Sequence, residues 1–309
     1  MGSRIDASMV DKWELYEIAR YCDESVSDGA GGTEPRFTCN VFIQSQQDAY
    51  TVLNDLAAVF RGITFWGNEQ LFVKADVPQD DVDWVYTASN VINGEFSYAG
   101  GSYKKRYSSC LVSWSDPVNH YSDTVEGVYD SALVERYQVN QLTLTAIGCT
   151  KQSEAHRRGR WALLSSVKDG SVTFGVGLDG YIPLPSQVIG VADPFRAGLQ
   201  NGGRMRAIKG REITLDRQVE YKPGARLLMN LPDGTTQSRT IDSVSEDGLT
   251  VTVTTSYSQN PVYGAVWAVD SDDVAIQYFR VISGCQRAGC FFSLGLCRKH
   301  LSFRQAGHA

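Results

Sequence analysis

The amino-acid sequence predicts an α+β protein in which most of the β-structure is antiparallel. Apolar residues recur at helical spacing in only three segments, whereas from residue 63 onward they mostly alternate with polar residues, as strands require. In addition, Asp233-Gly234 and Asp247-Gly248 separate alternating segments, and Asp-Gly is typical of antiparallel hairpins because both residues tolerate positive φ angles. Each element is considered below in chain order.

The first predicted helix follows Ser8, which forms a capping box with Asp11, and its apolar positions continue to Cys22. Glycine and proline in residues 28–35 forbid continuation, so this stretch is a predicted loop. A short strand with alternating sides is predicted for residues 37–43.

The second predicted helix starts at Ser45, with Asp48 three residues further on, and its apolar stripe ends near Phe60. Gly62 is placed to cap its end. The last predicted helix spans residues 152–164.

The remaining regular structure is predicted to be β. Strands are expected at 63–66, 71–75, 95–98, 107–114, 172–176, 187–191, 226–230, 235–244, 249–254, 265–269 and 279–282. The strands between about Gly203 and Ile282 predict a small antiparallel barrel or sandwich, because Asp-Gly turns connect them closely.

Length and composition limit the classes of protein to which the chain can belong. The 309 residues suffice for two modest domains or one large β-rich one, and 42% hydrophobic with 21% charged residues allows an ordinary core. The formal charge of −6 argues against a surface built entirely for nucleic acid. No signal peptide or membrane span is recognisable, which predicts a protein made and kept in the cytoplasm until it is assembled. The cysteine count of seven is odd, and four are expected to be reduced, small core hydrophobes: Cys22, Cys39, Cys110 and Cys149.

A search for catalytic or metal-binding residues identifies none. The acidic groups 80–83 and 272–273, made up of Asp80, Asp81, Asp83, Asp272 and Asp273, lack the ligand spacing of a calcium loop, which favours solvated turns. None of the histidines stands in a catalytic or zinc motif: His120, His156, His300 and His308. The glycine-rich stretches 29–32 and 175–177 are not followed by a nucleotide-binding helix. The sequence therefore predicts no enzyme and no cofactor.

The basic segment at residues 156–160 leaves two alternatives open. His156, Arg157, Arg158 and Arg160 precede Trp161 and form either a patch facing DNA or a partner, or a solvated helix face with the indole buried.

The C-terminal residues 284–309 are atypical, because they contain three cysteines and four basic residues but no acidic ones. The possible zinc ligands in this segment are Cys285, Cys290, Cys297 and His300, and their spacing matches that of zinc knuckles poorly. A shifted reading frame is the alternative, and it would remove a final strand expected after Ser283. The nucleotide sequence tests this hypothesis.

Several strings resemble the lambda-type phage tail tip attachment protein J family, also called host specificity proteins. The most specific are RYCDE at 20–24, EPRFTCNV at 34–41 and LVSWSDP at 111–117. Further strings follow in the same order at 48–50, 56–62, 159–161, 172–174, 177–180, 191–194, 202–204 and 231–235. The resemblance covers about residues 4–283.

The resemblance implies a fragment of a homotrimeric, baseplate-hub-like protein that closes the tail tube and supports host attachment. Implied domains are a partial α+β hub subdomain (1–104), a tube-like β domain with one helix (105–202), a small barrel insertion with a return strand (203–283) and the atypical tail (284–309). Implied partners are two further copies, other tail tip and tail tube proteins, and phage DNA passing through the lumen. Receptor contact is expected from segments absent here, and the location is the virion tail tip of a phage or prophage.

Two other functions remain as alternatives. A tail-associated glycan or peptidoglycan hydrolase would need two carboxylates facing each other across a cleft. A stand-alone carbohydrate-binding β module would need exposed aromatic residues along a groove, with Trp66, Trp84 and Trp267 as candidates. Burial in the core or an interface is the competing interpretation for these three side chains, because large aromatic groups usually bury.

Overall fold

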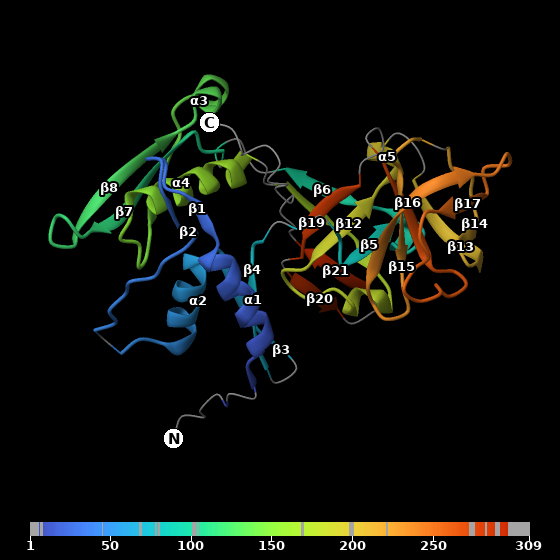
Figure 1. Ribbon diagram of the computed structural model, residues 1–309, viewed down its shortest axis with the longest axis horizontal. Helices are drawn as coiled ribbons and strands as arrows, with labels where there is room; N and C mark the ends of the chain where they lie inside the picture. Colours follow the sequence, from blue (N-terminus) through green and yellow to red (C-terminus); the bar gives the residue numbers. More distant parts are fainter. Residues whose placement is uncertain are drawn as a thin grey trace. The chain divides into compact units, whose positions relative to one another are not determined.

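The computed structural model describes residues 6, 9–44, 46–67, 70–77, 79, 81–100, 104, 106–167, 170–197, 201–220, 222–271, 276–281, 283–287 and 291–295. They form two compact units that alternate along the chain (Figure 1). The first unit combines Met1–Val77 with Gly101–Lys168, and the second combines Pro78–Gly100 with Asp169–Ala309. The sequence predicted contiguous segments 1–104 and 105–202 instead. The difference arises because the strands in residues 84–100 pair with strands that follow residue 169.

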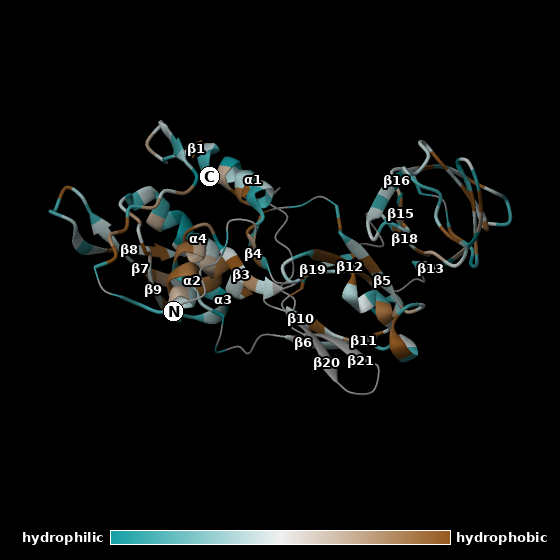
Figure 2. Cartoon of the chain, turned by 90° about the horizontal axis from the view of Figure 1, so that it is seen from below, coloured by the Kyte–Doolittle hydropathy of each residue, from teal (hydrophilic) through white to brown (hydrophobic). Residues whose placement is uncertain are grey.

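Two helices and two hairpins form the N-terminal part of the first unit. They are α1 (Lys12–Asp23), β1 (Ser25–Ser27), β2 (Thr33–Pro35), α2 (Ala49–Val59), β3 (Gly62–Gly67) and β4 (Gln70–Ala75). The two predicted N-terminal helices are thus confirmed. In Figure 2, α2 and β3 both carry hydrophobic, brown segments, and their contact buries Ala57 and Val59.

The helix ends correct the predicted caps. Asp11 caps α1 by accepting hydrogen bonds from the amides of Trp13 and Glu14, and Asp48 caps α2 in the same way. The predicted cap residues Ser8 and Ser45 lie outside the described residues. Gly62 begins β3, and the residue after α2 with a positive φ angle (61°) is Arg61. The predicted strand at 37–43 is wrong, because this segment is irregular and is held by single hydrogen bonds to the loop before α4.

The rest of the first unit is a three-stranded sheet covered by a helix. It contains β7 (Ser109–Asp116), β8 (Ser122–Tyr129), α3 (Ser131–Tyr137), β9 (Gln141–Thr145) and α4 (Gln152–Val167). The strand β7 is central, antiparallel to β8 and parallel to β9. Figure 1 shows α4 lying across β7 and β8. Gly159 permits this approach, because a Cβ atom there would lie 2.8 Å from Val128 and 2.9 Å from Val112.

The second unit contains three small sheets around one apolar cluster. The first sheet has the order β19 (Gln277–Arg280), β12 (Val188–Ala192) and β5 (Trp84–Thr87). The second pairs β6 (Ser97–Gly100) with β10 (Gly170–Thr173), and the third has the order β11 (Gly175–Val176), β21 (Phe291–Gly295) and β20 (Ser283–Arg287). Short helices η2 (Ile92–Gly94), η4 (Leu178–Tyr181) and α5 (Pro194–Ala197) connect them. The cluster between the sheets includes Tyr86, Phe174, Ile189 and Phe279.

A closed six-stranded barrel is inserted between β12 and β19. Its strands are β13 (Gly202–Lys209), β14 (Glu212–Leu215), β15 (Arg226–Asn230), β16 (Thr236–Val244), β17 (Thr250–Val253) and β18 (Val266–Asp270), in the order β13-β14-β17-β16-β15-β18. Trp267, Leu227 and Met229 are completely buried in its core. The predicted α+β class, the dominance of antiparallel strands and the small barrel are therefore confirmed.

The C-terminal hairpin differs from the expectation for residues 284–309. Rather than lacking a strand, the backbone forms β20 and β21, and Val176 of β11 pairs with Phe292. The sequence missed this hairpin because residues 291–294, Phe-Phe-Ser-Leu, do not alternate strictly between apolar and polar. None of the described helices is long and apolar enough to cross a membrane.

Candidate assembly surface and cleft

The acidic residues that the sequence singled out and the structure describes, Asp81 and Asp83, each hold a neighbouring segment. Within the described ranges, no group of three or more His, Cys, Asp or Glu side chains could hold a metal ion. Asp83 accepts a hydrogen bond from the amide of Val188 at 2.8 Å, and Asp81 accepts one from the hydroxyl of Ser238 at 3.0 Å. Both carboxylates therefore hold loops together. Outside the described residues lie Asp80, Asp272, Asp273, Cys290, Cys297, His300 and His308.

Four cysteines, Cys22, Cys39, Cys110 and Cys149, are free thiols in different surroundings. Cys110 and Cys149 are buried in the core between α4 and the β7–β9 sheet, as expected. Burial raises the pKa of Cys110 to about 11, which keeps this thiol protonated and inert at neutral pH. Cys22 is half-buried and Cys39 is exposed, so the expectation of a core position is wrong for Cys39.

The basic cluster on α4 is divided: His156 and Arg160 are exposed, whereas Arg157 and Arg158 are paired within the unit. Arg157 forms an ion pair with Glu34, and Arg158 forms one with Glu154 at 2.5 Å. The two arginine side chains are 26% and 11% exposed. Because both charges are satisfied by carboxylates of the same unit, this part of α4 anchors the chain around residue 34.

Glu154 is the centre of that anchor. Its side chain is fully buried, and one carboxylate oxygen accepts hydrogen bonds from the amide and the hydroxyl of Thr38, at 3.2 and 2.7 Å. The other oxygen accepts from Arg158. A buried charge is tolerated only when it is paired and hydrogen-bonded, and these three donors meet that condition. This carboxylate therefore helps to fix the irregular segment near residue 38 to α4.

A second contact joins the same segment to α4 through an arginine between two aromatic rings. The guanidinium of Arg61 lies 5.2 Å from the ring centre of Phe37 and 5.0 Å from that of Trp161. Burial lowers the pKa of Arg61 to about 10, so the side chain remains charged at neutral pH and the cation–π contacts persist. This arrangement, with Arg61 in a left-handed conformation, could not be read from sequence spacing.

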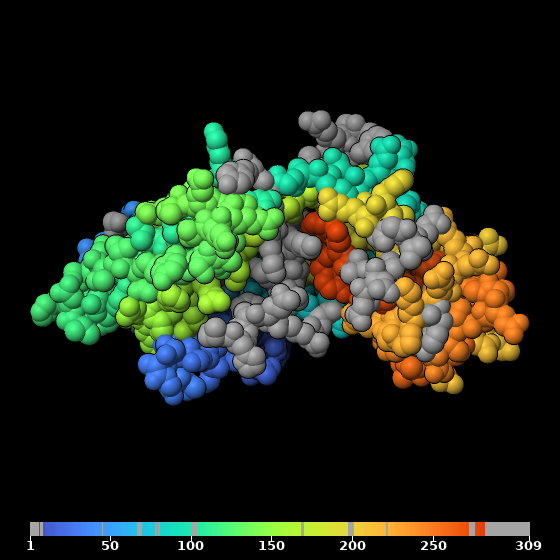
Figure 3. Space-filling model, turned by 90° about the horizontal axis from the view of Figure 1, so that it is seen from above, coloured from blue at the N-terminus to red at the C-terminus, as the bar shows by residue number. Residues whose placement is uncertain are grey.

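One face of the β7–β9 sheet is uncovered. Cys110, Val112 and Trp114 of β7 point toward α4, whereas Val125 and Tyr129 of β8 are 57% and 76% exposed. Within its sheet, β8 is an edge strand of eight residues. Figure 3 shows the green β7–β8 hairpin at the surface on the left of the view. A long edge strand with unpaired backbone groups and exposed apolar side chains favours pairing with another chain.

Exposed apolar side chains also gather on the N-terminal part of the first unit. They come from α1, the irregular segment that follows β2, α2 and β3. They are Trp13, Tyr16, Val41, Phe42, Ile43, Tyr50, Ile63 and Trp66. Where such side chains adjoin one another, they form the kind of contiguous apolar patch that marks interaction surfaces. The indole of Trp66, a candidate for lining a carbohydrate groove, lies here on the β3–β4 hairpin and not in a cleft of the second unit.

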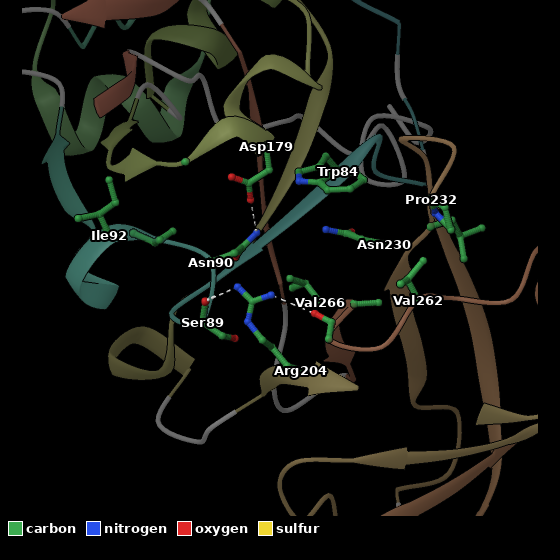
Figure 4. Close-up of a pocket in the computed structure, with 15 residues that line it drawn as sticks. Trp84, Ser89, Asn90, Ile92, Asp179, Arg204, Asn230, Pro232, Val262 and Val266 are labelled. Atoms are coloured by element: carbon green, nitrogen blue, oxygen red, sulfur yellow. Dashed lines mark hydrogen bonds between the residues drawn. The ribbon is translucent and has the colours of Figure 1, made fainter. Parts of the chain in front are cut away.

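The second unit contains a cleft of about 510 Å³ between the barrel and the β5 region. Figure 4 shows its polar side chains, which are Trp84, Asn90, Asp179, Arg204 and Asn230. The third aromatic candidate, Trp267, is buried in the barrel core and donates its N–H to Asp216 at 3.0 Å. Of the three tryptophans, Trp84 alone reaches this cleft.

Asn230 holds the barrel against β5 at the floor of the cleft. Its amide nitrogen donates to the carbonyl of Val85 at 3.0 Å, and its amide oxygen accepts from the amide of Val85 at 3.2 Å. Arg204 adds a second bridge by donating to the carbonyls of Ser89 and Gly264, at 2.9 and 3.0 Å. These contacts fix the geometry of the cleft.

The α+β fold, its inserted barrel and its uncovered strand edge fit a structural subunit of a larger assembly. The chain belongs to a phage tail family: residues 48–210, just over half of the chain, match the family described as "Putative phage tail protein". Family membership therefore places the chain among the proteins of virion tails.

Two curated relatives carry the name "Tip attachment protein J". The one from Escherichia phage SECphi27 is 41% identical over 275 residues, which cover 88% of this chain and 23% of the relative. The one from Escherichia phage SECphi4 is 42% identical over 285 residues, or 91% of this chain and 25% of the relative. The chain thus spans about a quarter of the length of these relatives, and the resemblance expected from the sequence is confirmed.

Solved structures show weaker similarity. A chain in the virion of a native gene transfer agent particle matches with a TM-score of 0.35 and 12% identity, covering 68% of this chain and 41% of that one. The prophage tail protein gp18 from Listeria monocytogenes EGD-e matches with a TM-score of 0.29 and 12% identity, covering 68% and 55%. These scores are too low to establish a shared fold.

Proposed function

We propose that this chain is the central, non-catalytic part of a trimeric hub at the tip of a phage tail. Three copies would form a ring through the β7–β9 sheet and the tube-like region, close the tail tube and support host attachment. The division proposed for this hub assigns assembly roles along the chain and does not describe the compact units, which interleave: hub subdomain 1–104, tube domain 105–202, barrel insertion 203–283 and atypical tail 284–309.

The observation that carries the proposal is the free edge of β8. Eight consecutive residues of this strand have no partner on one side within their sheet, and Val125 and Tyr129 stay exposed. Such an edge would aggregate in a monomer unless another chain covers it. Two close relatives are named for the tail tip, and that name supports placing the assembly there.

The remaining parts of the proposal concern partners and location. Other tail tip and tail tube proteins would dock on the ring, and phage DNA would pass through its lumen during ejection. The protein would be made in the host cytoplasm and then built into the virion. A catalytic role finds no support in the described residues, whose carboxylates at 81, 83 and 154 each hold a backbone segment in place.

The solution mass of the purified chain, measured by light scattering, tests the proposal. We expect association toward three times 34.1 kDa as concentration rises. Val125→Lys should shift the mass back to one chain, because an ammonium group on the exposed face of the edge strand repels an incoming strand. Thr240→Lys is the matched control, because it places the same charge on an exposed strand of the closed barrel, which has no edge.

A stable monomer at every concentration, for this chain and for the full-length protein alike, would overturn the trimeric hub. Trimers that Val125→Lys and Thr240→Lys leave equally intact would refute the role of β8. Turnover of peptidoglycan or glycan by the purified protein, lost in a single Asp or Glu variant, would revive the hydrolase alternative.

A further inference from the structure

The cleft in the second unit contains a hydrogen-bond donor that the protein does not use. Trp84 is only 7% exposed, and its indole N–H has no acceptor. Buried indole N–H groups usually find a partner, because leaving one unpaired costs about 1–3 kcal/mol. The matching group of Trp267 does find one, in Asp216. Figure 4 shows the indole nitrogen of Trp84 on the side of the ring that faces Asp179.

A carboxylate lines the same cleft. The carboxylate of Asp179 is half-buried, and one of its oxygens accepts a hydrogen bond from Asn90 at 3.1 Å. The hydroxyl of Tyr86 donates to the backbone carbonyl of Asp179 at 3.1 Å and so fixes the position of the residue. Burial raises the pKa of Asp179, which means that the charged form lacks full solvation and gains from a further donor.

The charges of the cleft disfavour an anionic ligand. Asp179 would repel an anion, and the guanidinium of Arg204 already donates to the carbonyls of Ser89 and Gly264. A ligand that pairs with both groups has to accept a hydrogen bond from the indole N–H of Trp84 and donate one to the carboxylate of Asp179. A hydroxyl group does both at once, whereas a peptide unit presents its acceptor and its donor on opposite sides of the chain.

The remaining lining suits an amphipathic ring. Aliphatic side chains of Val91, Ile92 and Val262 line the cleft and can contact C–H groups. Tyr263, which directly follows Val262 in the sequence, is 81% exposed. The volume of about 510 Å³ lies in the range of small-molecule sites.

We propose that this cleft binds a neutral saccharide unit, with a ring hydroxyl accepting from the indole N–H of Trp84 and donating to the carboxylate of Asp179. This site is independent of the trimeric hub, because every group that forms it belongs to one chain. It gives the barrel insertion a recognition role in addition to a structural one.

The resonance of the Trp84 indole proton reports directly on binding. The chain has six tryptophans, so an amide-type NMR correlation spectrum contains six indole signals, and the one lost in Trp84→Phe is assigned to Trp84. Glucose, galactose and N-acetylglucosamine are added separately to the whole chain. At least one should shift this signal saturably, with a dissociation constant of about 1–10 mM, as expected for a site with few hydrogen bonds. The signal of Trp66, in the first unit, should stay in place.

Asp179→Asn should weaken the binding at least ten-fold, because the amide replaces a charged acceptor with a weaker one. Asp247→Asn, which removes a carboxylate from an exposed barrel turn, is the matched control and should leave binding unchanged. The proposal would be overturned if no sugar shifted the Trp84 signal at about 100 mM, ten times the highest expected dissociation constant. Equal weakening of binding by Asp179→Asn and Asp247→Asn would also overturn it. So would a saturable shift with tri-alanine and none with the sugars, which would make the cleft a peptide site. If the trimeric hub failed and the sugar titration succeeded, the cleft would stand alone as a recognition site.

Discussion

Replacing Glu154 with glutamine tests how the N-terminal segment is attached to α4. The carboxylate accepts from Thr38 with one oxygen and from Arg158 with the other. An amide has one acceptor oxygen and one donor NH2 group. Whichever way the new side chain is oriented, its NH2 group would face a donor, either the amide and hydroxyl of Thr38 or the guanidinium of Arg158.

The loss of stability expected for Glu154→Gln depends on how deeply its ion pair with Arg158 is buried. The side chains of Glu154 and Arg158 are only 1% and 11% exposed, so solvent cannot replace the lost partner. Breaking a buried ion pair on one side costs about 3–5 kcal/mol. We take the lower end, about 3 kcal/mol, because Arg158 also donates to the carbonyl of Ile147 at 3.1 Å and retains that partner.

Native-state hydrogen exchange is the appropriate assay, because a chain of two units has no single free energy of unfolding. A loss of about 3 kcal/mol should speed exchange of the Thr38 amide on the order of 100-fold. Glu126→Gln is the matched control: Glu126 pairs with His156, whose side chain is 48% exposed, and we expect less than about 1 kcal/mol. Adding Arg158→Met to Glu154→Gln should recover most of the loss, because no buried charge then remains unpaired.

Equal exchange rates of Thr38 in Glu154→Gln and Glu126→Gln would refute the reasoning. The same holds if the double variant exchanged faster than the single one, because the cost would then not come from the unpaired guanidinium.

Three further predictions concern packing, pH and the barrel. Gly159→Val should destabilise the first unit by about 1–3 kcal/mol in thermal unfolding, because its Cβ would overlap Val128, whereas Gly170→Ala, with no atom within 4 Å of the added Cβ, should be nearly neutral. Burial would raise the pKa of Glu34, but hydrogen bonds from Ser153 and Arg157 outweigh burial and lower the pKa below 4.5. The stability that the ionised carboxylate contributes is therefore complete above pH 4.5 and is lost as the pH falls through the lowered pKa. Glu34→Gln should therefore lose less melting temperature in acid than the parent chain. Asn230→Asp should destabilise the second unit by about 2–3 kcal/mol, because the new carboxylate has no N–H to donate to the carbonyl of Val85. A melting temperature equal to that of the parent would show that the barrel does not depend on this bridge.

Local sequence signals predicted the elements that are stabilised locally. Four of the six barrel strands, β15, β16, β17 and β18, were predicted, because Asp-Gly marks the turns on either side of β16 and the alternation gives the buried face. The strand β15 was predicted at its observed bounds, Arg226–Asn230, whereas β13 and β14 were missed. The helix α4 was predicted at 152–164 and extends to Val167. These elements depend on contacts between residues near each other in the sequence.

Elements that depend on distant partners were missed or misjudged. The strand β5 has four buried residues and no alternation, because it pairs in parallel with β12, about 100 residues away in sequence. The segment at 37–43 alternates like a strand, yet its groups bond to Glu154 and Gly148 and not to a neighbouring strand. The division into interleaved units follows from the same distant pairings, which no local pattern records.

The cleft was anticipated only through Trp84, which the sequence selected as one of three aromatic candidates. Spacing could not separate it from Trp267, since both lie in apolar strands, and only the structure shows that the indole N–H of Trp267 has an acceptor whereas that of Trp84 has none. Arg204 and Asn230 gave no sequence signal, because each acts on a backbone carbonyl in a different strand or loop.

The most direct test of the tail-tip hub is the position and number of copies of this chain in assembled phage tails. An epitope inserted between Gln259 and Asn260, in an exposed barrel loop, can be labelled with an antibody and viewed by electron microscopy. The account predicts label only at the distal tip of the tail, with three copies per tail. Label along the tail tube or on the head, or a copy number at the tip other than three, would contradict the hub.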